Sequence, residues 1–259
     1  MEESPHEQGR SPEATYDIVV IGAGQAGLAI GSFLKRQERN FVILEGADSI
    51  GSAWRDRWES LRLFTPRRYS GLPGLPFPGD PEGYPVRNEV IAYLERYADT
   101  FELPIELNSL VRRLTRENGQ FVLEVEGRRI AAEQIVVATG PFQKPFIPEV
   151  ASRLEPEVFQ PHSTGYRKPS DVPEGTVLVV GGGNTGFQIA EELSNARRVV
   201  LAIGSRQTPL PATTAWPRSL LVADEDPSLQ YNRRIAARSE AAKSRDADRL
   251  QPAETSPQL

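Results

Sequence analysis

Apolar and polar positions follow a pattern that occurs twice along the chain. Near the N-terminus a short apolar run, Tyr16 to Ile21, ends at a glycine. The segment Gln25 to Arg36 then carries its apolar residues on one helical face, and a second short apolar run covers Phe41 to Leu44. Short apolar runs that end at glycine are typical of buried parallel strands. The apolar residues in the segment between the two runs have the spacing of an amphipathic helix. We predict a βαβ unit here.

The same order of elements returns in the second half of the chain. A strand is predicted over Thr176–Val180, a helix over Thr185–Asn195 and a strand over Arg198–Ile203. Strands that alternate with helices form parallel sheets covered by helices. The chain is therefore assigned to the α/β class, with two Rossmann-like βαβ domains.

The residues between these units predict one more helix and several strands. Helical spacing returns over Arg87–Phe101, and strands are expected at Ile105–Leu114, Gln120–Glu126, Arg128–Ala131 and Gln134–Ala138. Gly46–Val86 has no clear periodicity but is dense in proline and aromatic residues, which favours an ordered cover over a ligand. A second proline-rich connection covers Phe142–Gly175.

Composition excludes several classes of protein. The chain has 259 residues and a net charge of −5, which argues against a nucleic-acid partner. It has no cysteine, so disulfides, thiolate metal sites and a redox-active cysteine pair are excluded; with two histidines, no metal site is predicted. The acidic N-terminus does not resemble a secretory signal, and no apolar run reaches the about 18 residues of a spanning helix. We expect a cytoplasmic protein without a membrane partner.

The first βαβ unit contains a dinucleotide fingerprint. Its turn reads Gly22-Ala23-Gly24-Gln25-Ala26-Gly27, and the acid Glu45 ends the second strand. The first glycine allows the tight turn, the second lets a pyrophosphate approach the backbone, and the third lets helix and strand pack closely. The helix N-terminus favours the anion, and the acid binds ribose hydroxyls. The alternative is a glycine-rich helix start without a ligand.

The second unit repeats the glycines but not the acid. Its turn reads Gly181-Gly182-Gly183-Asn184-Thr185-Gly186, and Ser205-Arg206 follows the next strand. An acid would repel a 2′-phosphate, whereas a guanidinium pairs with it, so NADPH is favoured over NADH. The alternative is a surface arginine at the start of a loop. Together the two turns predict FAD at the first site and NADPH at the second.

At this point the chain resembles the flavin-containing monooxygenase superfamily, with the closest likeness to bacterial relatives of the auxin-forming monooxygenases of plants and of Baeyer–Villiger enzymes. The resemblance rests on the two glycine motifs and on a series of segments between them, in the family's order: Gly51-Ser52-Ala53-Trp54-Arg55, Leu61-Arg62-Leu63-Phe64-Thr65-Pro66, Leu75-Pro76-Phe77-Pro78, Tyr84-Pro85, Tyr93-Leu94 with Tyr97-Ala98, Ala138-Thr139-Gly140 and Phe159–Tyr166.

The resemblance implies a mechanism and a set of residues. NADPH would reduce FAD, and the reduced flavin would form a peroxide with O₂ that oxygenates a small organic substrate, such as an amine or sulfide, or inserts oxygen beside a carbonyl. The FAD-contacting residues would be Gly22, Gly24, Gln25, Ala26, Gly27, Glu45, Gly46, Trp54 and Arg55. Val111, Thr139 and Gly140 would lie near its adenosine and pyrophosphate. Leu63 and Phe64 would lie near the flavin ring, with Thr65 as the candidate catalytic residue. Gly181, Gly183, Asn184, Thr185, Gly186, Ser205 and Arg206 would hold NADPH.

Two departures from the family pattern limit the assignment. The linker holding His162 has Gln160-Pro161 where the family usually has a glycine, which weakens a Baeyer–Villiger assignment. The strip from Leu63 to Pro66 lacks the asparagine found in amine- and sulfide-oxidising members. By itself, a loop histidine such as His162 is more often structural than catalytic.

The C-terminal part of the chain departs most from the family pattern. After Pro211 the family pattern is lost, so we expect a disordered tail at 1–14, an FAD domain at 15–150, a linker with a partial NADPH domain at 151–211, and a divergent, disordered tail at 212–259. The chain resembles a C-terminally truncated member. Three functions stay open: a monooxygenase, as a homo-oligomer or completed by another chain; a flavin reductase or NADPH oxidase that releases hydrogen peroxide; and a catalytically impaired dinucleotide-binding protein.

Overall fold

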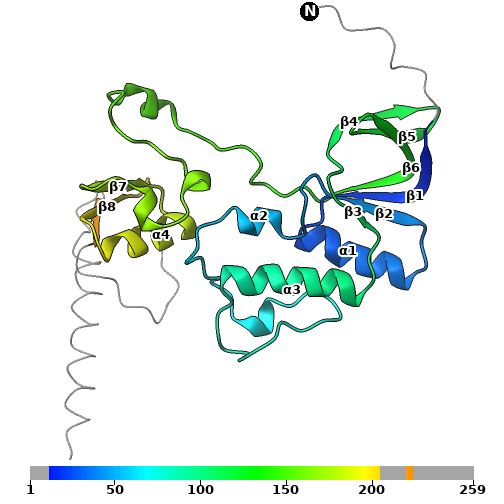
Figure 1. Ribbon diagram of the computed structural model, residues 1–259, viewed down its shortest axis with the longest axis horizontal. Helices are drawn as coiled ribbons and strands as arrows, with labels where there is room; N and C mark the ends of the chain where they lie inside the picture. The colour runs from blue at the N-terminus through cyan, green and yellow to red at the C-terminus, as the bar shows by residue number, and fades with distance from the viewer. Residues whose placement is uncertain (1–11, 205–219, 224–259) are drawn as a thin grey trace, which may run out of the picture. The chain divides into compact units, whose positions relative to one another are not determined.

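The computed structural model describes residues 12–204 and, for the backbone alone, residues 220–223 (Figure 1). The chain divides into two compact units, with the boundary between Lys168 and Pro169. Residues 151–168, expected to accompany the second domain as a linker, cluster with the first unit. The α/β class predicted from the sequence is confirmed.

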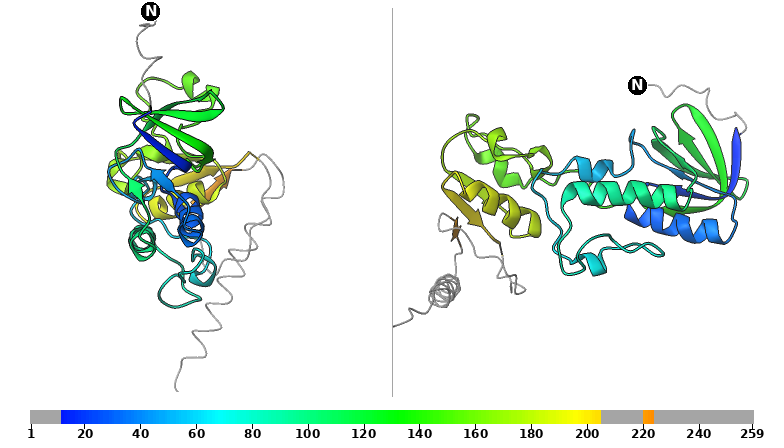
Figure 2. Two further views of the ribbon diagram at one scale, coloured as in Figure 1. Left: turned by 90° about the vertical axis from the view of Figure 1, so that its right-hand side faces the viewer. Right: turned by 60° about the horizontal axis from the view of Figure 1, so that its bottom comes forward.

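The first unit is built on one six-stranded sheet. Its strands are β1 (Ala14–Ile21), β2 (Phe41–Leu44), β3 (Ile105–Glu106), β4 (Val111–Glu117), β5 (Gln120–Val125) and β6 (Arg128–Val137). Their spatial order is β3-β2-β1-β6-β5-β4. The first four strands of this order are parallel, whereas β6, β5 and β4 form an antiparallel meander (Figures 1 and 2). Because β6 is parallel to β1, the carboxyl ends of these two strands lie at the same edge of the sheet.

Two strand predictions for this unit are wrong. The segment Ile105–Leu114 is not one strand, because the chain leaves the sheet after Glu106 and the Asn108 N–H donates to the Ala47 carbonyl at 2.8 Å. The segments Arg128–Ala131 and Gln134–Ala138 are not two strands. They form the single strand β6, because β6 pairs with β5 through its first half and with β1 along most of its length.

Two helices cover one face of this sheet. Helices α1 (Gln25–Arg36) and α3 (Arg87–Thr100) run side by side there (Figures 1 and 2). Tyr97 of α3 is fully buried, and its hydroxyl oxygen lies 2.8 Å from Ser32 Oγ of α1 and 2.7 Å from the Pro73 carbonyl oxygen. Apolar side chains from both helices and the sheet close the core, among them Val20, Leu28, Ile43, Tyr93 and Leu94. The opposite face is closed by the meander through Val19, Val42, Leu123 and Ile130.

The proline- and aromatic-rich stretch from 46 to 86 is ordered around short elements. It contains α2 (Ser52–Arg55) and the 3-10 turn η1 (Arg67–Tyr69). The Arg67 guanidinium forms two hydrogen bonds with the Glu89 carboxylate of α3, at 2.7 and 2.6 Å. The Tyr93 hydroxyl donates to the Leu75 carbonyl at 2.6 Å. Helix α3 thus holds the stretch in place, although the stretch has little regular structure.

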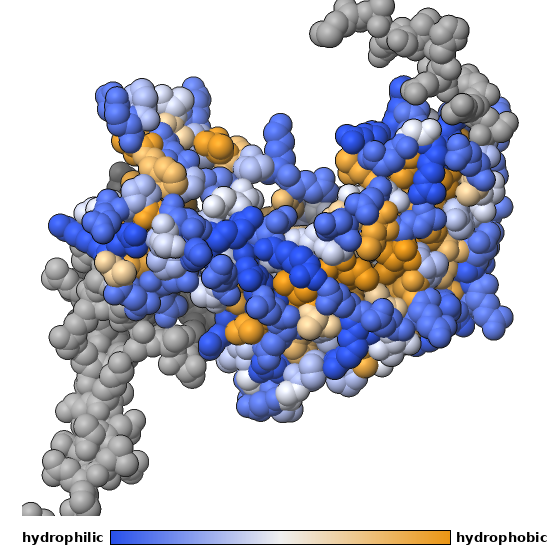
Figure 3. Space-filling model, in the orientation of Figure 1, coloured by the Kyte–Doolittle hydropathy of each residue, from blue (hydrophilic) through white to orange (hydrophobic). Residues whose placement is uncertain are grey.

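The connection from 138 to 176 contains three short 3-10 turns, η2 (Glu149–Arg153), η3 (Ser163–Gly165) and η4 (Pro169–Asp171). Its first part exposes large apolar side chains, with Phe142 73% and Phe146 82% exposed. Figure 3 shows apolar surface on this loop, which is drawn in green in Figure 1. No helix within the described ranges is both long and apolar enough to cross a membrane.

The second unit is a parallel sheet with one helix. Strands β7 (Val177–Val180), β8 (Val199–Ala202) and β9 (Leu220–Ala223) lie in that order, and α4 (Asn184–Ser194) connects the first two. Ile189 and Leu193 of α4 are buried, as is Leu201 of β8. Strand β9 lies inside the range 212–259, where a disordered tail was expected. The expectation does not hold for these four residues, because an apolar Leu-Leu-Val-Ala run pairs with β8.

Candidate functional site

The turn between β1 and α1 gives three glycines three separate geometries. Gly22 has φ +104°, and a Cβ there would lie 2.7 Å from the Ala138 carbonyl oxygen. A Cβ on Gly27 would lie 1.9 Å from the Gly22 carbonyl oxygen, whereas a Cβ on Gly24 would meet nothing within 4 Å. Gly22 and Gly27 are therefore required by the turn and by the packing of helix on strand. Gly24 is different, since it leaves open space beside the backbone.

The open space lies at the start of α1. Gly24 is the N-cap residue, no side chain caps the helix, and no acidic residue lies in its first turn. Gln25 and Ala26 are exposed. The first N–H groups of a helix lack partners within the helix, and together with the helix dipole they favour an anion. The residues present fit the pyrophosphate of a dinucleotide.

Glu45 lies immediately after β2 and faces this turn. Its carboxylate Oε2 accepts a hydrogen bond from the Ala23 N–H at 2.8 Å, and Oε1 accepts one from the Ala47 N–H at 3.1 Å. A carboxylate has about four lone-pair positions, so two such bonds leave it able to accept from ribose hydroxyls. The Glu45 side chain fits the ribose role assigned to it from the sequence.

Two further segments meet at this edge of the sheet. The Ser109 N–H donates to the Glu45 carbonyl at 2.7 Å, and a Cβ on Gly46 would lie 3.0 Å from Leu110 Cδ1, so the start of β4 at Val111 lies beside Glu45 and Gly46. At the end of β6 the Ala138 N–H donates to the Ile21 carbonyl at 2.8 Å. The exposed residues Thr139 and Gly140 therefore follow directly beside the glycine turn.

The residues assigned to the flavin ring and its surroundings lie on other segments. Trp54 packs against the main core, and Arg55 forms an ion pair with Glu95 of α3. Leu63 donates its N–H to the Pro85 carbonyl at 2.8 Å, Phe64 is 66% exposed, and Thr65 Oγ1 lies 3.2 Å from Ser70 Oγ. Among the described residues, no hydrogen bond joins this set to the glycine turn, so their grouping around a flavin remains a prediction.

Sequence reasoning missed the acidic partners on α3. Glu95 pairs with Arg55, and Glu89 pairs with Arg67 and also accepts the Val86 N–H at 2.8 Å. The Val86 hydrogen bond, and after it the Arg67 guanidinium, hold the pKa of the Glu89 carboxyl below its ordinary value. The available signal was the acidic residue three positions after the residue that precedes the helix, which is the spacing of a capping box.

The linker histidine makes local contacts. His162 Nδ1 lies 3.2 Å from the Thr164 backbone nitrogen, whose N–H donates to it, and 3.0 Å from Thr164 Oγ1. The Arg167 guanidinium donates to the Thr164 carbonyl at 2.7 Å and lies 3.7 Å from an Asp56 carboxylate oxygen. His162 thus shapes the η3 turn. No cluster of three or more His, Asp or Glu side chains suited to a metal occurs in the part of the chain that the structure describes.

The second unit repeats the geometry of the first turn. Gly181 has φ +122°, a Cβ on Gly186 would lie 2.0 Å from the Gly181 carbonyl oxygen, and a Cβ on Gly183 would meet nothing within 4 Å. Asn184 and Thr185 open α4, again without a side-chain cap or an acidic residue in the first turn. This turn also fits a pyrophosphate. Ser205 and Arg206, assigned to the 2′-phosphate, lie outside the described residues.

Comparison with known proteins places these features in a family. The model of the pyridine nucleotide-disulphide oxidoreductase family matches residues 19–242. An uncharacterized oxidoreductase, CzcO-like, from Geobacillus kaustophilus is 50% identical over 190 residues, which cover 73% of this chain and 55% of that protein. The probable indole-3-pyruvate monooxygenase YUCCA8 of Arabidopsis thaliana is 36% identical over 190 residues, covering 68% and 44%.

A solved structure also relates the chain to flavin-containing monooxygenases. The flavin-containing monooxygenase from Stenotrophomonas maltophilia superposes with a TM-score of 0.70 at 31% identity, covering 86% of this chain and 68% of that one. The chain spans about half the length of the curated relatives it matches.

Proposed function

Because the chain belongs to the pyridine nucleotide-disulphide oxidoreductase family, and within it to the flavin-containing monooxygenases, we propose that it is an FAD- and NADPH-dependent oxidoreductase of the monooxygenase type. The observation that carries the proposal is the repeated turn geometry. In both units the first glycine has a positive φ, a Cβ on the third glycine would clash with the carbonyl oxygen of the first, and the middle glycine, Gly24 or Gly183, faces open space at an ordinary φ.

Each part of the first site has a binding role in this proposal. The N–H groups at the start of α1 hold the pyrophosphate, and Glu45 accepts hydrogen bonds from the adenosine ribose. The Thr139-Gly140 segment borders the pyrophosphate, and Val111 borders the adenosine. A bound flavin would supply the hydride transfer and dioxygen chemistry, so the protein's own task is to bind and orient the two nucleotides and to exclude water.

The second site is proposed to hold NADPH. The start of α4 receives its pyrophosphate beside Gly183, and Arg206 pairs with the 2′-phosphate. Cysteine chemistry has no part in this proposal, because the chain contains no cysteine although its family includes disulphide oxidoreductases. The substrate is proposed to be a small soft nucleophile or a carbonyl compound.

A second candidate function is a flavin reductase or NADPH oxidase that releases hydrogen peroxide. One observation favours it, because Phe64, assigned to the flavin ring, is 66% exposed. Oxygen transfer to a substrate needs a site that excludes water, whereas peroxide release does not. A homo-oligomer or a completing polypeptide chain that covers this surface would restore the first function.

The experiment that tests the proposal is an absorption spectrum of the purified chain after addition of FAD and gel filtration. A retained flavin spectrum that bleaches with NADPH supports the oxidoreductase, and the peroxide yield with and without substrate separates oxygenation from oxidase activity. A colourless eluate from a folded chain contradicts both candidates and leaves the third function, an impaired nucleotide-binding protein. The Gly24→Val variant is the control for specific binding at the first site.

A further inference from the structure

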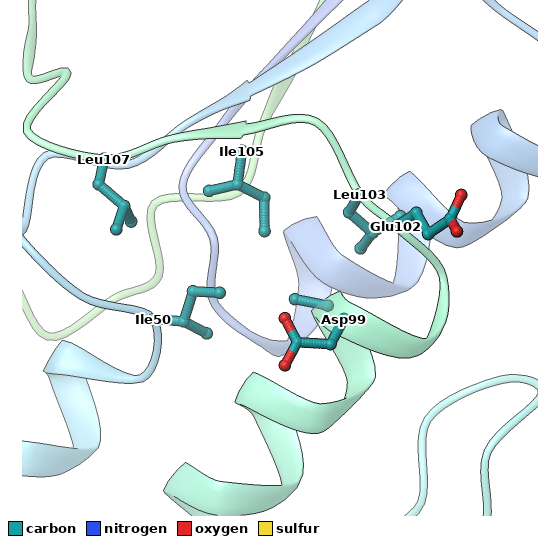
Figure 4. Close-up of a pocket in the computed structure, with 7 residues that line it drawn as sticks. Ile50, Asp99, Glu102, Leu103, Ile105 and Leu107 are labelled. Carbon is teal, nitrogen blue, oxygen red and sulfur yellow. The ribbon is translucent and has the colours of Figure 1, made fainter.

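A hollow at the edge of the first sheet takes no part in the proposed dinucleotide sites. It has a volume of about 370 Å³ and lies between the C-terminal end of α3, the edge strand β3 and the loop after β2 (Figure 4). Its lining includes Ile50, Leu103, Ile105 and Leu107, with the acids Asp99 and Glu102. Sites for small molecules have volumes of about 300–1,000 Å³, mostly apolar walls and few polar groups. This hollow is at the lower end of that range and has the same composition.

The two acids differ in their electrostatic surroundings. Lys35 of α1 places its Nζ 3.7 Å from Glu102 Oε2 and donates to the Glu102 carbonyl at 3.1 Å. The Asp99 carboxylate has no ion-pair partner among the described residues. In Figure 4 it points toward Ile50, whereas the Glu102 carboxylate points away from Ile50. The hollow therefore contains one uncompensated negative charge.

The helix adds to this negative charge. Asp99 lies in the last turn of α3, which contains no basic residue. The C-terminal end of a helix carries a partial negative charge and favours a cation, so an acid in the last turn is unfavourable by itself. A bound cation beside Asp99 would interact favourably with both the carboxylate and the helix end.

The walls select for an apolar body attached to that cation. Leu107 is 37% exposed, and Ile50, Leu103 and Ile105 are half-buried, so apolar surface remains open to water in the hollow. Covering apolar surface contributes roughly 25 cal/mol per Å². An inorganic cation would leave these walls exposed, and a neutral hydrocarbon would leave Asp99 without a partner.

We propose that this hollow binds a small amphipathic organic amine, with the ammonium group beside Asp99 and an aliphatic or aromatic body against Ile50, Ile105 and Leu107. The site uses none of the residues assigned to FAD or NADPH. Binding there is independent of the proposed function, and each can fail without the other.

The test is a calorimetric titration of the full chain with hexylamine and, separately, with hexanol, which has the same chain without the charge. Saturable amine binding with a Kd on the order of 1 mM is expected for so small a ligand. Hexanol should bind more weakly. Added salt should weaken the amine alone, because the Asp99 site is open to solvent.

Two variants locate the site. Asp99→Asn should weaken hexylamine binding by roughly threefold to tenfold and leave hexanol binding unchanged. Glu102→Gln is the matched control and should leave the affinity for hexylamine within about twofold, because Lys35 already compensates that charge. Circular dichroism and flavin retention should be unchanged in both variants. The proposal is overturned if hexylamine shows no saturable binding, if hexanol binds equally well, or if Asp99→Asn binds hexylamine as the natural chain does.

Discussion

The Glu45 carboxylate accepts a hydrogen bond from the Ala23 N–H at 2.8 Å, which ties the end of β2 to the glycine turn after β1. The two residues are 22 positions apart, and helix α1 separates them in sequence. The parallel pairing of β1 with β2 brings them together, because it places both carboxyl ends at one edge of the sheet. The same carboxylate is thus held in place by the turn beside which a ribose would bind.

Replacing Glu45 with alanine should weaken FAD binding. The variant removes the charged acceptor of the ribose hydroxyls, and a net loss equal to one hydrogen bond to a charged group, about 1.5–3 kcal/mol, raises Kd by roughly one to two orders of magnitude. Fluorescence titration of FAD measures this change. Glu133→Gln, at an exposed position on β6, is the control and should bind FAD as the natural chain does. Equal affinity in Glu45→Ala would remove the ribose role.

Two glycine variants should separate folding from binding. Gly27→Ala places a Cβ 1.9 Å from the Gly22 carbonyl oxygen and should lower stability by about 1–3 kcal/mol or more. Gly24→Val extends into open space and should lower the thermal midpoint less than Gly27→Ala, through the weaker N-cap alone, yet fail to retain FAD on gel filtration. Thermal melts and absorption spectra of both variants check this. A Gly24→Val protein that stays yellow would contradict the pyrophosphate assignment.

Arg206 should determine the preference between the two nicotinamide nucleotides. Removing the guanidinium in Arg206→Ala should raise the Kd of NADPH by roughly tenfold and change that of NADH little, because only NADPH carries the 2′-phosphate. Titration of both nucleotides gives the ratio. An unchanged ratio would show that the 2′-phosphate is recognised elsewhere. Arg198→Ala, at the residue directly before β8, serves as the control.

Glu89 should contribute stability that depends on pH. Its pKa is lowered in the folded chain, chiefly by the Val86 N–H and then by Arg67, so its contribution is present above the unfolded value, about 4.3, and is lost as the pH falls through the lower folded value. Because the Glu89 side chain is 43% exposed, its interactions are screened by solvent, and Glu89→Gln should cost about 0.5–1 kcal/mol at pH 7.

Urea unfolding at pH 7 and near pH 3 measures this difference, which should shrink at the lower pH. Glu82→Gln removes an acid that pairs with Arg68 on the same stretch, but its side chain is 65% exposed. This control should change the free energy of unfolding by less than about 0.5 kcal/mol. A Glu89→Gln difference that stays constant with pH would contradict the linkage.

The Tyr97 hydroxyl should stabilise the first unit from inside. Tyr97→Phe leaves the Pro73 carbonyl and Ser32 Oγ without this partner and should cost about 1–3 kcal/mol. Tyr69→Phe removes a hydroxyl from a side chain that is 69% exposed and should cost less than about 0.5 kcal/mol. Urea unfolding of both variants compares them. Similar losses in the two would show that the buried contacts contribute no net stability.

The local pattern of apolar residues was sufficient to predict elements whose boundaries depend on neighbouring residues alone. The boundaries of α1 and β2 follow from their apolar residues, with Gly24 before α1 and Asn40 before β2, and the structure confirms Gln25–Arg36 and Phe41–Leu44 as predicted. The strand pattern failed at 105–114 and at 128–138. In both places the choice between one strand and two depends on which distant strand supplies the hydrogen bonds, and a local apolar pattern does not contain that information.

By itself, the sequence determined the two βαβ units and the glycine turns, because helical periodicity, strand runs and the need for glycine at a tight turn act within about 30 residues. Only the tertiary structure decided which glycines are enforced by packing and which face open space, since a Cβ clash depends on backbone from another strand or turn. It also decided the acidic partners on α3 and the hollow at Asp99. These depend on packing a helix against loops that are distant in sequence, and charge and burial there follow from the fold as a whole.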